Sequence, residues 1–398
     1  MSASSGGNPS REPVPRDPVP GWLMGTRPGL AYRRLPPTGR PSGRPSRIEQ
    51  TRPNRPDPGW LLAGWRRRPP DLGRATLRND WCGHPARCLL RVASMTLARS
   101  VLPGMTVMVT RRTVRRVHLL RPDPQVRELY LYFLAVLAKR YGILVHSVVL
   151  MSTHPHLVVT DTRGNLLLFL REFHRMVALA LKVMRKWEGP VWDHERPSVV
   201  HLRTPQAVIE SLAYSMANPV ASGLVRRARD WPGVNTLPEA LGRGRWTVNR
   251  PAQYVDPNNP MWPEQATLEL TMPPGMPMRD DKVRQAVADE LQALEKQAHA
   301  TVRTKGIAFL GAERARTGSP YKRSKSWEPL RGRNPSFAVG KDQPEAFREA
   351  VQALRAFRQS YREALTRWRD GLRSVVFPAG TWMMQWLHRA AVAPPLAA

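Results

Sequence analysis

The feature that most constrains the fold of this chain is an ordered series of strand and helix patterns from Met105 to Asn218. Short apolar runs alternate with longer segments whose apolar residues recur every three or four positions. The order is strand, helix, strand, strand, helix, strand, helix. This order predicts a small α+β sandwich with helices on one side of a largely antiparallel sheet. The expected strands are 105–110, 143–151, 156–161 and 198–202, and the expected helices begin at Pro124, Leu166 and Pro205.

Capping residues and prolines predict where these helices begin and end. Asp123 is a typical N-cap in front of a proline, and Gly142 is placed to close the same helix. The second helix is expected to run to Trp187, with Gly189 and Pro190 ending it. The third is expected to stop near Asn218, because Pro219 lacks the backbone N–H that continues a helix.

Composition divides the chain into four regions. Residues 1–98 are rich in proline and arginine and show no apolar period, so they are expected to be disordered. An alternative interpretation is that this stretch is upstream GC-rich DNA read in frame, with Met95 as the true start. The other regions are an α+β domain over 99–240, a proline-rich linker over 241–278 and a helical, basic extension over 279–398.

Two long helices are expected in this extension. One runs from Asp280 to about His299, and the other begins after Asp342 and is ended by Pro378. The second carries an apolar stripe that predicts core packing, and the two helices are expected to pack as a hairpin on the core domain or on each other. The polar, basic stretch 312–341 between them is expected to be a loop.

The charge balance favours a polyanionic partner. The 398 residues carry 62 Lys+Arg against 31 Asp+Glu, a formal net charge of +31. Such a surface suits nucleic acid or an anionic membrane. No apolar run approaches the roughly 18 residues that a membrane span requires, and no secretory signal is recognisable at the N-terminus. A cytoplasmic, nucleoid-associated protein with a nucleic-acid partner is therefore expected.

Two histidines at the end of an apolar run are the first candidate for chemistry. His154 and His156 follow the strand pattern 143–151. Residues i and i+2 of a strand project to the same face, so the two imidazoles can converge on one metal ion. Neutral imidazole suits Mn²⁺ and similar ions, and Mg²⁺ is the abundant alternative.

A helical tyrosine supplies a matching nucleophile. Tyr214 and Asn218 are four residues apart and therefore lie on one face of the expected helix. A divalent ion held by His154, His156 and the Asn218 amide can polarise a phosphodiester oxygen. Tyr214 can then attack the phosphorus as a phenolate and form a covalent phosphotyrosine.

These residues resemble the REP-associated tyrosine transposases, a family of single-tyrosine HUH endonucleases. The resemblance lies in Met151–Val159, in Tyr214–Val220, in the stretch before the last core strand and in the stretch around Trp231, and covers roughly residues 104–240. It implies a ferredoxin-like, HUH-type catalytic domain. It also implies cleavage and rejoining of hairpin-containing single-stranded DNA through a 5′-phosphotyrosine, with Tyr214 as nucleophile and His154, His156 and Asn218 at the metal.

The sequence departs from the family pattern in two respects. Pro155 replaces a bulky apolar residue between the histidines, which predicts a local bulge, and Ser152-Thr153 stand where Pro-Asn is usual. One alternative is a catalytically inactive nucleic-acid-binding protein derived from a transposase core, and another is a phosphodiesterase that uses activated water. The protein is expected to act as a monomer or homodimer. The expected DNA contacts are Arg226, Arg227, Arg229, His194 and Arg175.

Overall fold

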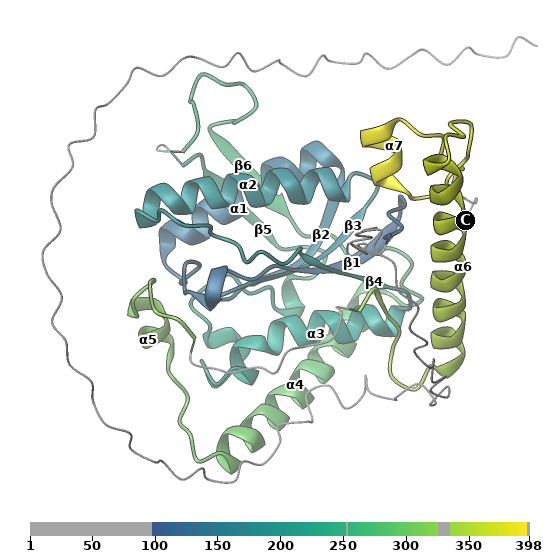
Figure 1. The fold of residues 1–398 in the computed structure, drawn as a ribbon. Helices are drawn as coiled ribbons and strands as arrows, with labels where there is room; N and C mark the ends of the chain where they lie inside the picture. The colour runs from purple at the N-terminus through teal and green to yellow at the C-terminus, as the bar shows by residue number, and fades with distance from the viewer. Residues whose placement is uncertain (1–97, 252–253, 325–334, 396–398) are drawn as a thin grey trace, which may run out of the picture. The chain divides into compact units, whose positions relative to one another are not determined.

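The computed structural model describes residues 98–251, 254–324 and 335–395 (Figure 1). The expected disorder of residues 1–98 and the alternative start at Met95 lie outside the described residues, apart from residue 98 itself. Among the described helices, none is long and apolar enough to cross a bilayer.

A five-stranded sheet forms the centre, in the order β2-β3-β1-β4-β7. All neighbouring strands are antiparallel except β4 and β7, which are parallel. The α+β class and the largely antiparallel sheet are thus confirmed. The bounds are β1 Met105–Thr110, β2 Ile143–Leu150, β3 Pro155–Asp161, β4 Ser198–Leu202 and β7 Phe337–Ala338.

Helices cover both faces of this sheet, so the expectation of helices on one side is wrong. Figure 1 shows α1 and α2 over one face and α3 and α4 over the other. Alternation along β3 explains the two layers: Leu157 and Val159 join the core under α1 and α2, whereas Val158 joins the core under α3 and α4. The bounds are α1 Pro124–Tyr141, α2 Leu166–Arg185, α3 Pro205–Ala221 and α4 Asp280–Thr304.

Side-chain caps start two of these helices where the sequence predicts. Asp123 accepts a hydrogen bond from the Val126 N–H at the start of α1, and Gly142 ends that helix with φ 69°. The Asp161 carboxylate accepts from the Leu166 N–H at 2.7 Å and so caps α2. However, α2 ends at Arg185, earlier than expected, because Lys186 adopts the left-handed conformation that closes the helix.

Two expectations about prolines are also wrong. Helix α3 continues through Pro219 to Ala221. A proline so near the end of a helix removes one hydrogen bond but leaves few turns beyond it to disrupt. Pro155 is the first residue of β3 and pairs with Leu150 in register, a position that tolerates the missing N–H. The register shift lies instead in β2, between Val145 and Ser147.

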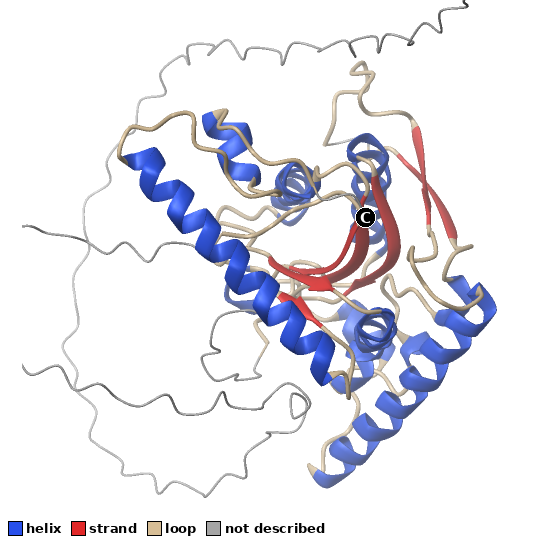
Figure 2. Ribbon diagram, turned by 90° about the vertical axis from the view of Figure 1, so that its right-hand side faces the viewer, coloured by secondary structure: helices blue, strands red, loops and turns tan. Residues whose placement is uncertain are grey.

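The region expected as a linker contains a second, two-stranded sheet. Strands β5 Arg245–Asn249 and β6 Gln265–Glu269 pair antiparallel, and Figure 2 shows them apart from the main sheet. Val248, Trp262 and Leu268 are buried in the same core as α1. Segment 241–278 therefore contributes structure to the α1 side of the molecule.

The C-terminal elements differ in detail from the expected pair of helices. The stretch 312–341 contains helix α5 Ala312–Thr317 and strand β7, so it is not a loop throughout. Helix α4 packs on α3, which agrees with docking on the core domain. Helix α6 Pro344–Arg369 ends before Pro378. Within this helix only Ala350 and Ala364 are buried, and the apolar stripe that predicted core packing remains partly exposed. Its last turns pack on Phe377, near helix α7 Trp382–His388.

Candidate active site

The turn between β2 and β3 carries the first histidine. The Met151 N–H donates to the His154 carbonyl at 3.0 Å, which closes the turn. The turn is anchored from outside, because the Ser152 carbonyl accepts from the Leu120 N–H and the Thr153 carbonyl accepts from the Thr113 N–H. His154 therefore lies in a fixed turn just before β3, between the two strands that the sequence predicts.

The two histidines lie side by side, as predicted. Their ring centroids are 4.8 Å apart, with an angle of 72° between the rings. Each ring uses Nδ1 for a threonine hydroxyl: His154 with Thr153 Oγ1 at 2.9 Å, and His156 with Thr110 Oγ1 at 3.2 Å. When Nδ1 carries the proton, Nε2 keeps its lone pair and becomes the nitrogen that can bind a cation.

His156 is held in its neutral form. Burial lowers its pKa well below the usual value, and the charges of His154 and Arg112 lower the pKa further. Its side chain is 3% exposed, and its Nε2 is buried with no hydrogen-bond partner. A buried, neutral imidazole with an unused nitrogen is the form that a metal ion requires.

Tyr214 reaches this histidine from helix α3. The ring centroids of His156 and Tyr214 are 5.8 Å apart, with an interplanar angle of 86°. Tyr214 is 41% exposed, so a large substrate has access to its phenol, while Asn218 one turn later is 8% exposed. The structure thus brings together three residues that the sequence singled out, His154, His156 and Tyr214, and places Asn218 one helical turn beyond Tyr214.

The C-terminal part of α3 is fixed to the edge of β2 by residues that the sequence did not single out for this role. Asn235 Nδ2 donates to the Met216 carbonyl at 3.2 Å and to the Ala228 carbonyl at 3.0 Å. The indole of Trp231 donates to the Leu150 carbonyl at 3.1 Å. These bonds set the distance between the helix that carries Tyr214 and the strand that precedes the histidines.

The donor set is compatible with a divalent cation, but it contains no carboxylate. Within the described ranges, no group of three or more His, Cys, Asp or Glu side chains could hold a metal ion. Two imidazoles and one amide oxygen nevertheless leave positions for phosphate oxygens and water, which a site for phosphoryl chemistry needs. The buried, unpartnered Nε2 of His156 is the observation that favours such a ligand.

The expected DNA contacts are distributed unevenly around this site. Arg226, Arg227 and Arg229 are exposed just beyond α3, although Arg227 pairs with Asp230 at 3.3 Å. His194 is exposed and pairs with Asp193, whose N–H donates to the Arg112 carbonyl. Arg175 lies on α2, on the opposite face of the sheet, where it pairs with Glu172. The structure therefore does not bring Arg175 to the site.

Three further residues at the site were missed by sequence reasoning. Thr110 and Thr153 contact the histidine Nδ1 atoms, and the positive charge of Arg112 acts on His156. Thr110 and Arg112 come from the end of β1 and from the residues after it, far from the histidines in sequence. No periodicity or spacing marks them, because only the pairing of β1 with β3 places them there.

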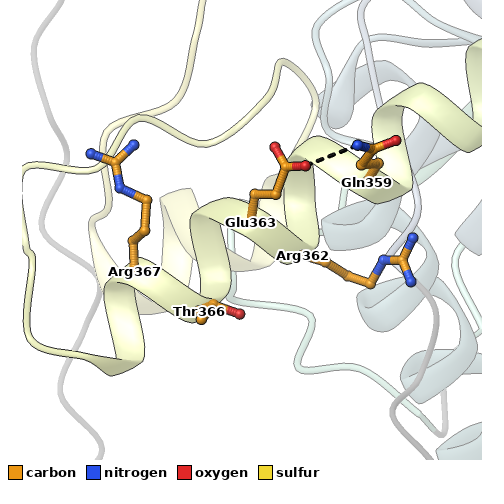
Figure 3. Close-up of a pocket in the computed structure, with 5 residues that line it drawn as sticks. All are labelled: Gln359, Arg362, Glu363, Thr366 and Arg367. Atoms are coloured by element: carbon orange, nitrogen blue, oxygen red, sulfur yellow. Dashed lines mark hydrogen bonds between the residues drawn. The ribbon is translucent and has the colours of Figure 1, made fainter.

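A second surface feature lies on α6 and has different properties. Figure 3 shows Gln359 and Glu363, joined by a 3.0 Å hydrogen bond, beside Arg362, Thr366 and Arg367. All five side chains are exposed and belong to one helix. These exposed side chains offer less chemistry than the histidine and tyrosine cluster.

Fold and site together define an α+β protein with a histidine pair facing a helical tyrosine. Comparison with protein-family models and with curated proteins gives no match. Among solved structures, the chain is similar to one described as a REP-associated tyrosine transposase bound to a REP hairpin. The identity is 21%, the alignment covers 34% of this chain and 78% of that chain, and the TM-score is 0.29. These values are too low to carry a functional argument.

Proposed function

We propose that this protein is a DNA strand transferase of the single-tyrosine HUH type that cleaves and rejoins single-stranded DNA. Tyr214 is the nucleophile, and His154, His156 and Asn218 hold a divalent metal, Mg²⁺ or Mn²⁺. The observation that carries the proposal is the convergence of three rings, from the turn before β3, from β3 and from α3: His154 lies beside His156, and His156 lies beside Tyr214. The preferred substrate is a strand that contains a hairpin.

The reaction is a transesterification in which one phosphodiester replaces another. The Tyr214 Oη attacks the phosphorus, a Tyr–O–P bond forms, and the bond from phosphorus to the 3′ oxygen breaks. The Tyr214 hydroxyl loses its proton to water as it attacks, and the leaving oxygen takes a proton from water and becomes a free 3′-OH, while the 5′ phosphate stays on Tyr214. The metal, when bound, polarises a non-bridging oxygen of the phosphate. Attack by another 3′-OH reverses the step and joins the strand to a new end.

The chain's own residues position the reacting groups. Thr110 and Thr153 orient the two imidazoles, and burial keeps His156 neutral. Packing of α3 on the sheet places Tyr214 on a rigid element, which holds a nucleophile more precisely than a loop. The arginines beyond α3, Arg226 and Arg229 among them, are placed to contact the phosphate backbone.

The test uses a labelled single-stranded DNA hairpin incubated with the full chain and Mn²⁺ or Mg²⁺. We expect a protein–DNA adduct that survives denaturation, that is lost in Tyr214→Phe and that persists in Tyr361→Phe on helix α6. Cleaved product without an adduct would favour hydrolysis by activated water. Binding without product would favour the inactive nucleic-acid-binding alternative. The inactive alternative was based partly on the expectation that Pro155 distorts the site. Pro155 pairs with Leu150 in regular register, so that expectation no longer supports the alternative.

A further inference from the structure

A short C-terminal segment crosses back over the region that supports the histidine turn. We call residues Ser319–Ser324 the strap. The Ser324 N–H donates to the Arg116 carbonyl at 3.0 Å, the His118 N–H donates to the Lys322 carbonyl at 2.9 Å, and Val117 and Arg323 form an antiparallel bridge. The strap is therefore paired with the segment around the short helix η2 Val114–Arg116 as an added strand would be.

The strap presents an aromatic pair to solvent. Tyr321 is 53% exposed, and its ring is stacked with that of Trp187, with centroids 6.4 Å apart and an interplanar angle of 15°. The Tyr321 hydroxyl donates to the Arg185 carbonyl at 2.7 Å, and the Trp187 indole donates to the Pro190 carbonyl at 3.0 Å. Both polar groups are satisfied, so the exposed ring surface is what remains for a ligand.

Four basic residues flank this pair in the sequence or lie on the segment that pairs with the strap. Arg115 lies on η2, Lys186 precedes Trp187, and Lys322 and Arg323 follow Tyr321; all four are exposed. The exposed acid nearest in sequence is Glu188. The strap, these cations and Trp187 together form what we call the strap surface, which is positively charged and aromatic.

The backbone is strained at two of these cations, Arg115 and Lys186, and at the neighbouring Arg116. Arg115, Arg116 and Lys186 have φ of 49°, 54° and 47°, a region that side chains other than glycine rarely adopt. Such strain persists only where the surroundings impose it, and it is concentrated at functional sites.

The strap surface adjoins the proposed active site through direct backbone bonds. Thr113 and Leu120 flank the segment that pairs with the strap. Their N–H groups donate to the carbonyls of Thr153 and Ser152, in the turn that ends at His154. The segment that pairs with the strap is therefore bonded directly to the turn that carries His154.

We propose that the strap surface binds the single-stranded DNA that flanks the scissile phosphate, with bases stacked on Tyr321 and phosphates paired with the surrounding cations. The proposal rests on the proposed function for its substrate. An exposed aromatic ring, stacked on a second ring and accompanied by cations, is the combination that recognises unpaired nucleotides. Duplex DNA hides its base faces and would need only the cations.

The test measures equilibrium binding of a labelled hairpin with a single-stranded tail, by fluorescence anisotropy at several salt concentrations. All proteins are full-length and carry Tyr214→Phe, so that no covalent capture occurs. Tyr321→Ala should weaken binding about 10-fold, whereas Tyr321→Phe should bind normally because the ring remains. Trp386→Ala, an exposed and stacked tryptophan on α7, is the matched control and should bind normally.

The charges of the strap surface are tested with separate variants. The salt dependence of binding then distinguishes the loss of phosphate contacts from a change in the conformation of the strap. Lys322→Gln with Arg323→Gln should lower the slope of log affinity against log salt by about 1.4, because each phosphate contact to a single strand contributes about 0.7. Lys282→Gln on α4 is the control and should leave the slope unchanged.

The outcomes separate this proposal from the proposed function. Normal affinity in Tyr321→Ala together with an unchanged slope in the double variant would overturn the strap proposal, whatever the adduct assay shows. Equal loss of affinity for a blunt hairpin without a tail would also overturn it, since no unpaired base could then be the ligand. A third outcome is binding of the tailed hairpin that depends on the strap, together with no adduct in the wild type. This outcome would support the strap proposal and contradict the proposed strand-transferase function.

Discussion

His156 and Tyr214 lie on different elements and 58 positions apart in sequence, yet their ring centroids are 5.8 Å apart and their planes nearly perpendicular. His156 is on β3, in the middle of the sheet, and Tyr214 is on α3, which packs over that face. The contact places a neutral, buried imidazole beside a solvent-accessible phenol. This relationship underlies the predictions about the site.

Replacing either histidine should abolish metal binding. We expect His154→Ala and His156→Ala to lose the Mn²⁺ signal that the wild type gives by electron paramagnetic resonance, because two imidazoles are the only nitrogen donors proposed for the ion. His388→Ala, an exposed histidine on α7, should bind as the wild type does. Retention of full Mn²⁺ affinity by both active-site variants would exclude this metal site.

Thr110→Val should weaken the metal without removing a ligand. The hydroxyl of Thr110 is 3.2 Å from His156 Nδ1 and orients the ring. Loss of such an outer partner lowers metal affinity about 10-fold. Thr247→Val, which breaks a 2.9 Å hydroxyl pair with Thr267 on β5 and β6, is the isosteric control. Mn²⁺ titration of both variants measures the effect, and equal affinities would argue against an orienting role.

Stability should fall below pH 6.5 through His146. Burial lowers the pKa of this histidine to about 4, and the neutral ring is bonded to the Thr271 carbonyl and to Thr160 Oγ1. Between pH 6.5 and 4, His146 binds a proton in the unfolded chain but stays neutral in the folded chain. The free energy of unfolding is therefore unaffected above pH 6.5 and has lost on the order of 3 kcal/mol from this group at pH 4.

Urea unfolding of His146→Gln over this pH range checks the effect. The variant should show a shallower decline than the wild type, even if it is less stable at pH 7. The exposed His388 serves again as the control, since His388→Gln should leave the decline unchanged. A decline as steep in His146→Gln as in the wild type would contradict the assignment.

Asp123→Ala should lower the free energy of unfolding by more than the loss of a helix cap alone would. The Asp123 carboxylate accepts from the Val126 N–H and forms a buried ion pair with Arg185. Its removal leaves the Arg185 charge buried without this partner, which costs about 3–5 kcal/mol. Asp281→Ala, which breaks an exposed pair with Arg279, should cost at most about 1 kcal/mol. Denaturant midpoints compare the two, and similar shifts would contradict the prediction.

The local signals predicted local structure well. Asp123, Gly142 and the apolar period between them predicted α1 with its bounds, and the short apolar runs predicted β1 and β4 residue for residue. These elements depend on capping chemistry and on side-chain period, which neighbours in sequence decide. The sequence did not predict the end of α2 or the continuation of α3 through Pro219. Gly189 and Pro219 were expected to end these helices, whereas Lys186 ends α2 and Pro219 lies inside α3.

The arrangement of the elements required tertiary contacts. Nothing in the period of α3 indicates that it covers the face opposite α1 and α2, and this choice depends on which apolar stripe meets which face of β3. The same limit explains the strap. Its basic sequence suggested a loop, and only its backbone pairing with residues 116–118 brings Tyr321 to Trp187.

By itself, the sequence determined the residues available for chemistry: two histidines separated by one residue, and a tyrosine and an asparagine one helical turn apart. Their spacing follows from covalent geometry and so needs no tertiary information. The tertiary structure decided that the two sets meet, that Thr110 orients His156, and that Arg175 is left on the far face. Such contacts join segments far apart in the chain, and only the packing of α3 against the sheet brings them together.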